Sequence, residues 1–254
     1  MGVSISLKDK AALVTGGGRG MGRAIALRFA EAGCKGVAVL ELMQDEALEE
    51  VGEEIKKRGS EPLLIAGDVS DCEAVRKAVD SVVQKWGRID VLMNNAGIGR
   101  RGDFFNTPED EWKKVLDVNL SSVFYGMKYA AGYMKEQGGG AIINMASMSG
   151  VTGGTQGPHY SASKAGVIAL TKFGAMTLGK FGIRVNAMAP GYIQTDMLEA
   201  LFKDPEVRKQ RWATIPAGRP GDPQEVANMA AFLASDLASY VSGDTMLVTG
   251  GRLS

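Results

Sequence analysis

The chain has 254 residues, of which 45% are hydrophobic and 23% are charged, and its 29 basic residues equal its 29 acidic residues in number. A net charge of zero offers no general attraction to nucleic acid or to an anionic membrane. No apolar run approaches the roughly 18 residues of a membrane span, and the N-terminal MGVSISLKDK lacks the apolar core of a secretory signal. We therefore expect a cytoplasmic protein that has neither nucleic-acid nor membrane partners.

Few side chains are available for metal binding or for disulfides. Cys34 and Cys72 lie far apart without metal-ligand spacing, and His159 is the sole histidine. We therefore expect no metal site and no disulfide framework. A serine hydrolase would have to use His159 itself, and the Gly-x-Ser-x-Gly elbow of one common hydrolase fold is absent around Ser147.

Short apolar runs alternate with helical patterns along the whole chain. We predict strands over residues 11–15, 37–40, 63–66, 91–93, 141–145, 183–188 and 245–248. We predict helices over residues 23–32, 42–58, 71–86, 108–135, 158–181, 195–212 (weaker, and interrupted by Pro205) and 223–234. This alternation indicates an α/β fold with a parallel sheet covered on both faces. No linker-like run divides the chain, so we expect one domain over residues 1–254.

A glycine cluster joins the first strand to the first helix. It reads Thr15-Gly16-x-x-x-Gly20-x-Gly22. Glycines let the backbone approach a pyrophosphate, which the N–H groups and the dipole of the helix N-terminus then stabilise. The spacing differs from the G-x-G-x-x-G fingerprint, so a glycine-rich turn without a ligand remains an alternative.

Two charged side chains bear on the choice between NAD and NADP. Glu41 ends the second strand, where a carboxylate can bond ribose hydroxyls and repel a 2′-phosphate. Arg19, in the glycine cluster, could instead pair with that phosphate. We favour NAD, because repulsion of a buried dianion is harder to evade than the lack of an attraction, and NADP remains possible.

The stretch from Ser147 to Lys164 contains a serine, a tyrosine and a lysine at offsets of 0, 13 and 17. Tyr160 and Lys164 lie one turn apart on a single helix face. A phenol titrates at about 10, and a neighbouring cation favours the phenolate and lowers this pKa. The pair can therefore work as a general acid or base, and the Ser147 hydroxyl could hold a substrate oxygen.

These motifs form an ordered set with Asn94-Asn95-Ala96-Gly97, Asn119 and Pro190-Gly191. From about Leu7 to Gly251 the chain resembles the classical short-chain dehydrogenase/reductases. The resemblance implies that Tyr160 is the general acid/base, that Lys164 lowers its pKa and holds the nicotinamide ribose, that Ser147 polarises the substrate oxygen, and that Asn119 supports a water-linked proton relay. It implies cofactor contacts for Gly16, Arg19, Gly20, Met21, Gly22, Glu41, Asp68, Val69, Asn95, Ala96, Gly97, Tyr160, Lys164, Pro190, Gly191, Ile193 and Thr195.

The resemblance also implies the fold, the assembly and the reaction. The fold would be a Rossmann-type, doubly wound parallel sheet of about seven strands in the order 3-2-1-4-5-6-7, usually in a homotetramer. The main hypothesis is an NAD(H)-dependent oxidoreductase that interconverts a secondary alcohol and a ketone. One alternative is a reductase of 3-oxoacyl thioesters of acyl carrier protein or CoA, with NADPH as a possible cofactor. Another is a non-catalytic dinucleotide-binding subunit.

The substrate contacts are less defined by sequence. The candidates are Met148, Gln156, His159, Tyr192 and Arg100. Arg100 and its neighbour Arg101 could hold an acidic or CoA-bearing substrate, or they could be a solvated pair. His159 is expected to line the pocket or to pack, and Met148, Met188 and Met197 could shape an apolar wall. Residues 192–212 are expected to form a mobile substrate lid.

Overall fold

The computed structural model describes residues 4–154, 156–201 and 204–253. Within these ranges, seven parallel strands form a sheet in the order β3-β2-β1-β4-β5-β6-β7. Their bounds are β1 Ala11–Thr15, β2 Gly36–Glu41, β3 Glu61–Ala66, β4 Val91–Asn94, β5 Gly140–Met145, β6 Ile183–Pro190 and β7 Thr245–Val248. The predicted strand order and fold class are confirmed.

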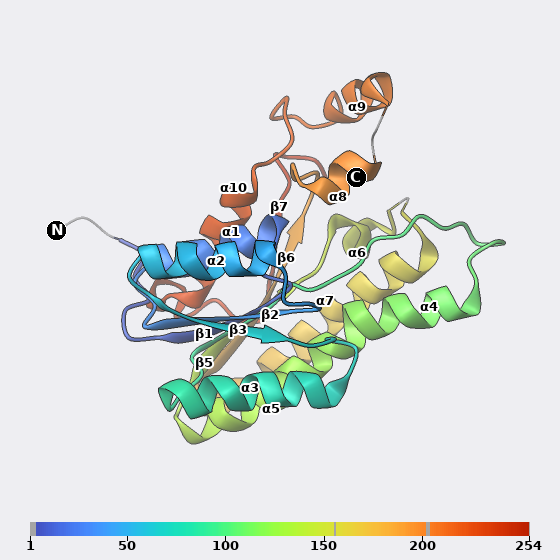
Figure 1. Ribbon diagram of the computed structural model, residues 1–254. Coiled ribbons are helices and arrows are strands. Elements are labelled where there is room, and N and C mark those ends of the chain that lie inside the picture. The colour runs from blue at the N-terminus through green and yellow to red at the C-terminus, as the bar shows by residue number, and fades with distance from the viewer. Residues whose placement is uncertain (1–3, 155, 202–203, 254) are drawn as a thin grey trace.

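Helices follow the strands in alternation, as Figure 1 shows. The α-helices are α1 Gly20–Glu31, α2 Glu46–Lys57, α3 Cys72–Trp86, α4 Glu109–Leu116, α5 Ser122–Glu136, α6 Met148–Thr152, α7 Pro158–Leu178, α8 Asp196–Leu201, α9 Pro205–Trp212 and α10 Pro223–Ala234. Three short turns complete the set: the π-helical η1 Asp117–Ser121 and the 3-10 turns η2 Gly179–Phe181 and η3 Asp236–Ala238.

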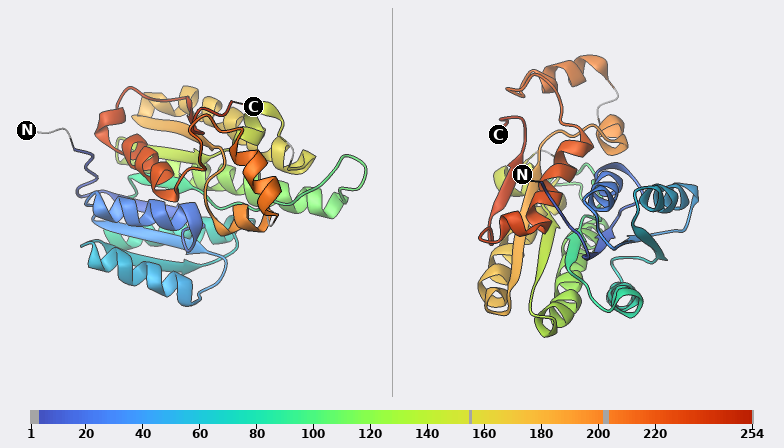
Figure 2. Two further views of the ribbon diagram at one scale, coloured as in Figure 1. Left: turned by 90° about the horizontal axis from the view of Figure 1, so that it is seen from above. Right: turned by 90° about the vertical axis from the view of Figure 1, so that its left-hand side faces the viewer.

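The sheet separates two apolar cores. Side chains alternate across a strand, so Val37 and Val39 of β2 face one core while Ala38 and Leu40 face the other. Helices α1, α2 and α10 cover the first face, and α3, α5 and α7 cover the second. Figure 2 shows the same layers from two further directions. The five inner strands are buried on both faces, which explains why they read as short, continuous apolar runs, whereas the edge strands β3 and β7 are partly exposed.

The structure corrects the predicted helix over residues 108–135. It consists of α4, the π-helical turn η1 and α5, because the backbone widens by one residue per turn around the buried Asn119. Apolar periodicity continues through such a turn, so the sequence pattern could not reveal it.

The predicted interruption by Pro205 in the weak pattern over residues 195–212 is confirmed, since this stretch contains α8 and α9. Asp204 caps α9 by accepting a hydrogen bond from the Glu206 N–H, with Pro205 at the first helical position. Residues 202–203 lie outside the described ranges. Helix α6 was not predicted; Ser147 caps it, and it ends at Gly153 with a φ of 87°.

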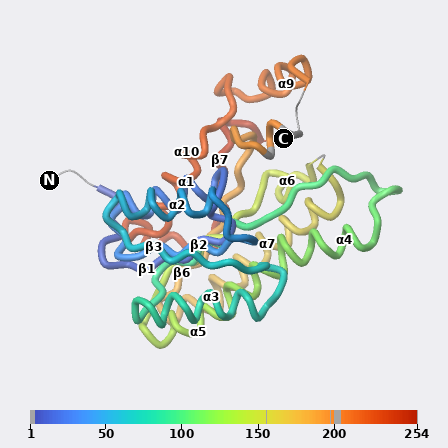
Figure 3. The backbone as a smooth tube through the Cα atoms, in the orientation of Figure 1, coloured from blue at the N-terminus to red at the C-terminus, as the bar shows by residue number. Residues whose placement is uncertain are grey.

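The sheet brings distant parts of the chain to one edge. The strand order reverses between β1 and β4, and in doubly wound sheets ligands bind outside the carboxyl ends of strands at this switch point. At this edge the connection from β4 to α4 passes near α6 in Figure 3, where the Gly102 N–H donates to the Gln156 carbonyl at 3.0 Å. Helices α8 and α9 lie beyond the end of β6 (Figure 1).

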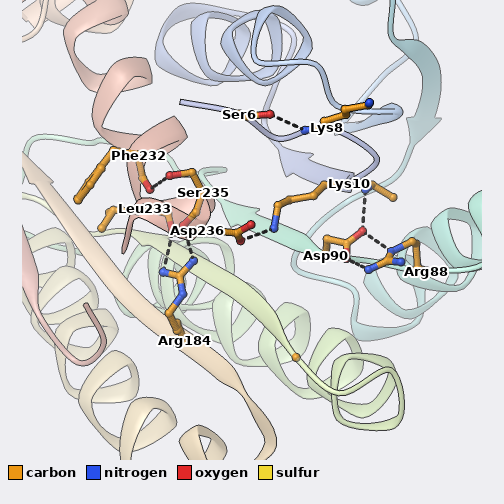
Figure 4. Close-up of polar contacts among 12 residues, drawn as sticks. Ser6, Lys8, Lys10, Arg88, Asp90, Arg184, Phe232, Leu233, Ser235 and Asp236 are labelled. Atoms are coloured by element: carbon orange, nitrogen blue, oxygen red, sulfur yellow. Dashed lines mark hydrogen bonds and ion pairs between the residues drawn. The ribbon is translucent and has the colours of Figure 1, made fainter. Parts of the chain in front are cut away.

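The opposite edge of the sheet is tied by polar contacts (Figure 4). Asp90, which is 7% exposed, accepts a hydrogen bond from the Ala11 N–H at 2.8 Å and pairs with Arg88 through both carboxylate oxygens. This carboxylate joins the start of β1 to the start of β4. Asp236 pairs with Lys10 at 2.8 Å, but its side chain is 88% exposed.

We predict that Asp90→Ala lowers the free energy of unfolding by about 2–3 kcal/mol, because the substitution leaves the buried Ala11 N–H without an acceptor. Asp236→Ala is the matched control and should cost less than about 1 kcal/mol, since its ion pair is exposed to solvent. Urea denaturation of both variants measures the difference. Equal losses would contradict the bracing role of Asp90.

Candidate active site

The glycine loop lies at the carboxyl end of β1 and leads directly into α1. Gly16 and Gly20 have φ values of 63° and 53°, which favour glycine. At Gly22 an added Cβ would lie 1.9 Å from the Gly16 carbonyl oxygen. The first turn of α1 contains no acidic residue, and Arg19 provides no side-chain cap. The helix N-terminus is therefore suited to an anion.

The loop is fixed from the β4 side. The Thr15 hydroxyl accepts hydrogen bonds from the N–H groups of Asn95 and Ala96, at 3.1 and 3.0 Å. The Asn95 amide in turn donates to the carbonyls of Thr15 and Gly16, at 3.0 and 2.8 Å. These four hydrogen bonds connect the carboxyl ends of β1 and β4, and the Asn95 side chain holds the start of the glycine loop in place.

The carboxylate of Glu41 also contacts the loop. Its Oε2 accepts from the Gly18 N–H at 2.9 Å, and its Oε1 accepts from the Leu42 N–H at 3.1 Å. Arg19 is held by Asp45, the residue that caps α2 by accepting from the Leu48 N–H. The hydrogen bond from the Leu48 N–H and then the one from Arg19 keep the pKa of Asp45 below its ordinary value, so Asp45 stays charged. The guanidinium in the glycine loop therefore has a carboxylate partner.

The other residues implied for the adenosine side follow β3 and β4. Asp68 is exposed and accepts from the N–H and the hydroxyl of Ser70, whereas Val69 is buried. A Cβ on Gly97 would lie 3.2 Å from the Asn119 side-chain oxygen and 3.4 Å from Lys164 Nζ. Glycine therefore lets the chain pass close to these two side chains.

Asn119 clamps the chain after β4. It is fully buried, and its Oδ1 accepts from the Ile98 N–H at 2.8 Å. Its Nδ2 donates to the Ile98 carbonyl at 2.9 Å and to the Ser163 hydroxyl at 3.3 Å. The side chain that the resemblance implies for a proton relay is thus engaged with backbone and with α7.

Ser147, Tyr160 and Lys164 converge at the carboxyl end of β5. Ser147 caps α6 by accepting from the Ser149 N–H at 3.1 Å. Tyr160 lies in the first turn of α7, and Lys164 follows one turn later. Lys164 is 3% exposed and donates from Nζ to the Met145 carbonyl at 2.7 Å, while its Nζ lies 5.9 Å from the centre of the Tyr160 ring.

Burial shifts the pKa values of both titratable groups. Tyr160 is half-buried, and partial desolvation raises its pKa above the ordinary value of 10, while interaction with Ser147 partly offsets this rise. Burial lowers the pKa of Lys164 from 10.5 to about 8. The upward direction for Tyr160 differs from the expectation based on an adjacent ammonium, because desolvation outweighs the favourable interactions.

These three residues line a cavity of about 590 Å³. Met148, Gln156 and Tyr192 also line it, as do Arg101 and, from the predicted nucleotide side, Met21, Asn95, Gly97, Pro190, Gly191, Ile193 and Thr195. Arg100 is exposed and is not among the lining residues. Met188 is buried in the core, and the side chain of Met197 lies outside the described part of the structure.

His159 packs behind the cavity wall. It is fully buried, and its Nδ1 accepts from the Tyr160 N–H at 2.8 Å. Its Nε2 lies 3.4 Å from Glu111 Oε1 on α4. Both ring nitrogens therefore have partners other than Ser147, which speaks against a serine hydrolase.

The segment after β6 closes the nucleotide side. The Gly191 N–H donates to the Val248 carbonyl at 3.0 Å, and Ile193 bridges to Gly221. A Cβ on Gly20 would lie 3.5 Å from Thr195 Cγ2, so the glycine loop faces this segment. The structure thus brings the loop after β1 and the loop after β6 together over one cavity.

Sequence reasoning missed Ile98 and Arg252, which line this cavity. Leu198, Val207 and Arg211 also line it; they fall within the predicted lid over residues 192–212, although none of them was singled out. Ser147 followed by Gly153 matches a helix cap and a C-terminal glycine, and this pattern could have indicated α6. Nothing local marks Arg211 or Arg252, since both reach the cavity through tertiary contacts.

Comparison with known proteins defines the class. The sequence model described as enoyl-(acyl carrier protein) reductase matches residues 16–252. The 3-oxoacyl-[acyl-carrier-protein] reductase FabG of Staphylococcus aureus is 45% identical over 242 residues, which cover 95% of this chain and 97% of that protein. A 3alpha-hydroxysteroid dehydrogenase of Mediterraneibacter gnavus is 44% identical over 98% of both chains. The structure of NAD⁺-bound xylitol dehydrogenase superposes with a TM-score of 0.91 at 37% identity, over 96% of this chain and 99% of that one.

The fold and these similarities make the protein an oxidoreductase that acts on CH–OH groups with a nicotinamide dinucleotide. The chain belongs to the short-chain dehydrogenase/reductase family. Its residues fit the nucleotide, because the glycine loop leaves space that a Cβ would fill and presents a helix N-terminus without an acidic residue. Helices long and apolar enough to cross a membrane do not occur within the described residues.

We predict that the stability difference between the wild type and Lys164→Met changes with pH. The folded-state pKa of Lys164, about 8, lies below its ordinary 10.5. The unfolded chain therefore binds more protons between these values, and wild-type stability rises relative to the variant as pH increases from 8 to 10.5. The full change is about 3 kcal/mol.

Urea unfolding at pH 7 and pH 10 measures this change. Lys172→Met, on an exposed position of the same helix, is the control and should show the same difference at both pH values. A wild-type advantage over Lys164→Met that stays constant would show that the Lys164 ammonium is not desolvated.

Proposed function

We propose that the protein interconverts a secondary alcohol and a ketone, with Tyr160 as the acid/base. The observation that carries this proposal is that Ser147, Tyr160 and Lys164 line one cavity at the carboxyl end of β5. A bound nicotinamide supplies or accepts the hydride. The carbonyl oxygen gains negative charge during reduction, and hydroxyl donors at Ser147 and Tyr160 are suited to stabilise it.

Proton transfer is assigned to Tyr160. Its hydroxyl gives a proton to the developing alkoxide during reduction and takes one from the alcohol during oxidation. Lys164 is held by the Met145 carbonyl, and in its charged form it favours the phenolate and can hold a ribose hydroxyl. Asn119 keeps the chain after β4 in place through both Ile98 backbone groups. We assign it a supporting part in proton supply.

The cofactor is proposed to extend along the carboxyl edge of the sheet. Gly16, Gly20, Met21 and Gly22 would hold the pyrophosphate at the N-terminus of α1. The adenosine side is assigned to Arg19, Glu41, Asp68, Val69, Asn95, Ala96 and Gly97, and the nicotinamide side to Tyr160, Lys164, Pro190, Gly191, Ile193 and Thr195.

NAD is the proposed physiological cofactor. Glu41 places a carboxylate on the glycine loop, and Asp45 occupies the guanidinium that could otherwise bind a 2′-phosphate. Two carboxylates thus oppose a dianion in this region. The NAD⁺-bound state of the xylitol dehydrogenase relative agrees with this preference.

A second candidate is reduction of 3-oxoacyl thioesters. It is favoured by the 45% identity to a 3-oxoacyl-[acyl-carrier-protein] reductase over almost the whole chain. A non-catalytic role has less support, since Asn119, Ser147, Tyr160 and Lys164 are all present.

We further propose a single domain over residues 1–254, a substrate lid over residues 192–212, a homotetramer and a cytoplasmic location. Met148, Gln156 and Tyr192 are the proposed substrate contacts within the cavity.

We predict that Tyr160→Phe lowers kcat by at least about 100-fold, because the acid/base is lost while the ring is retained. Absorbance at 340 nm with a panel of alcohols, ketones and acyl thioesters measures turnover. Binding of NADH, followed by its fluorescence, should remain within about three-fold of the wild type. A Tyr160→Phe enzyme with normal turnover would refute the assignment.

We predict that kcat/KM is higher with NADH than with NADPH, by about 10-fold or more for a poorly screened carboxylate facing a phosphate. Asp45→Asn keeps the helix cap and frees Arg19, so it should narrow this preference several-fold. Glu50→Gln removes the same charge from an exposed position of α2 and should leave the preference unchanged. A wild-type preference for NADPH would contradict the role of Glu41.

A further inference from the structure

The cavity that contains Ser147 and Tyr160 is lined by charges of one sign. Its charged lining residues are Lys164, Arg101, Arg211 and Arg252, and no aspartate or glutamate lines it within the described part of the chain. Lys164 is already engaged with the Met145 carbonyl. Arg211 and Arg252, with Arg101 at the rim, place positive charge at the substrate side of the cavity, where low-dielectric walls strengthen attraction to an anion.

The arginines come from three separate segments. Arg101 lies between β4 and α4, Arg211 lies on α9, and Arg252 follows β7. The segment that follows α9 and the segment that follows β7 are connected by a hydrogen bond from the Ala217 N–H to the Gly250 carbonyl at 3.0 Å. A Cβ on Gly251 would lie only 3.2 Å from the Pro216 ring, so the C-terminal segment packs tightly against the chain that follows α9.

Two buried donors in the cavity wall have no partner among the described residues. They are Nε of Arg252 and Nε2 of Gln156. The guanidinium of Arg252 is nevertheless held in place, since its Cζ lies 4.6 Å from the centre of the Tyr192 ring. Buried polar groups are normally hydrogen-bonded. Both residues line the cavity, so their unsatisfied donors favour a ligand with oxygen atoms at this site.

These arginines are separate from the part of the chain suited to the nucleotide phosphates. The helix N-terminus that can bind a pyrophosphate belongs to the glycine loop. The arginine of that loop, Arg19, pairs with Asp45 and is not a lining residue of the cavity. Arg252 instead contacts Tyr192, and both line the cavity together with Gln156 and Met148.

We propose that the substrate carries an anionic oxygen group, a carboxylate or a phosphate, which Arg211 and Arg252 bind with Gln156 while Arg101 attracts it at the rim. This inference rests on the proposed alcohol–ketone chemistry and specifies its substrate class. Ile98, Met148, Leu198 and Val207 line the same cavity. The substrate is therefore amphiphilic, with an apolar body between the reacting carbon and the anion.

The first test compares matched substrates with the wild-type enzyme. Oxo acids with one to four carbons between the carbonyl and the carboxylate are each measured against their methyl esters. A 3-oxoacyl-CoA is measured against the same acyl chain on N-acetylcysteamine, which lacks phosphate. In at least one of these pairs, kcat/KM for the anionic substrate should exceed kcat/KM for its neutral analogue by ~10-fold or more, because the anion accepts charge-assisted hydrogen bonds. The acid series and the CoA pair distinguish a carboxylate from a phosphate.

The second test assigns the preference to residues. In Arg211→Gln and Arg252→Gln, the ratio of kcat/KM for the anionic substrate to that for its neutral partner should fall by ~10-fold, mainly through KM. Lys209→Gln removes a positive charge from an exposed position of α9 outside the cavity and should leave the ratio unchanged. NADH fluorescence verifies that each variant still binds the nucleotide. The first test uses the wild-type enzyme alone, so it does not depend on the folding of any variant.

The outcomes separate this inference from the proposed function. Turnover of neutral ketones at least equal to that of every anionic partner would overturn the anion site and leave the alcohol–ketone chemistry intact. A preference for the anion that persists in both arginine variants would overturn the assigned residues. Absence of turnover with every member of the panel would refute the proposed function and this inference with it.

Discussion

The hydrogen bond from Lys164 Nζ to the Met145 carbonyl is the contact on which the arrangement of the site depends. It is buried, 2.7 Å long, and joins α7 to the carboxyl end of β5. Tyr160 precedes Lys164 by one turn, and Ser147 follows Met145 by two residues, so this contact sets both side chains relative to each other. Helix α6 also packs closely against α7 at Gly150, where an added Cβ would lie only 2.5 Å from the Lys164 carbonyl carbon. Glycine therefore permits this close approach.

Desolvation at this contact also sets the pKa values of the two titratable side chains. Desolvation raises the pKa of the Tyr160 phenol and lowers that of the Lys164 ammonium to about 8, so their ordinary order is reversed. At the glycine loop, the carboxylates of Glu41 and Asp45 outnumber the single guanidinium of Arg19, and they would oppose a 2′-phosphate. The guanidinium groups of Arg211 and Arg252 line the cavity and would attract an anionic substrate.

Much of the fold could be predicted, because each element carries its own local signal. Buried parallel strands are apolar runs, and helices such as α10 begin at a capping box with Asp222 and Glu225. The π-helical turn at Asn119 was not predicted, because it lies within one continuous helical pattern. The interruption at Pro205 was predicted from the sequence, and α9 begins there.

The sequence by itself determined the order of strands and helices, the glycine loop after β1, and the spacing of Ser147, Tyr160 and Lys164, since these depend on neighbours along the chain. Tertiary structure alone decided that His159 packs behind the wall against Glu111, that Arg101 rather than Arg100 lines the cavity, and that Arg211 and Arg252 join it. The physical reason is that the cavity lies where the carboxyl ends of parallel strands meet, so its lining comes from segments whose proximity depends on sheet order and packing rather than on local sequence.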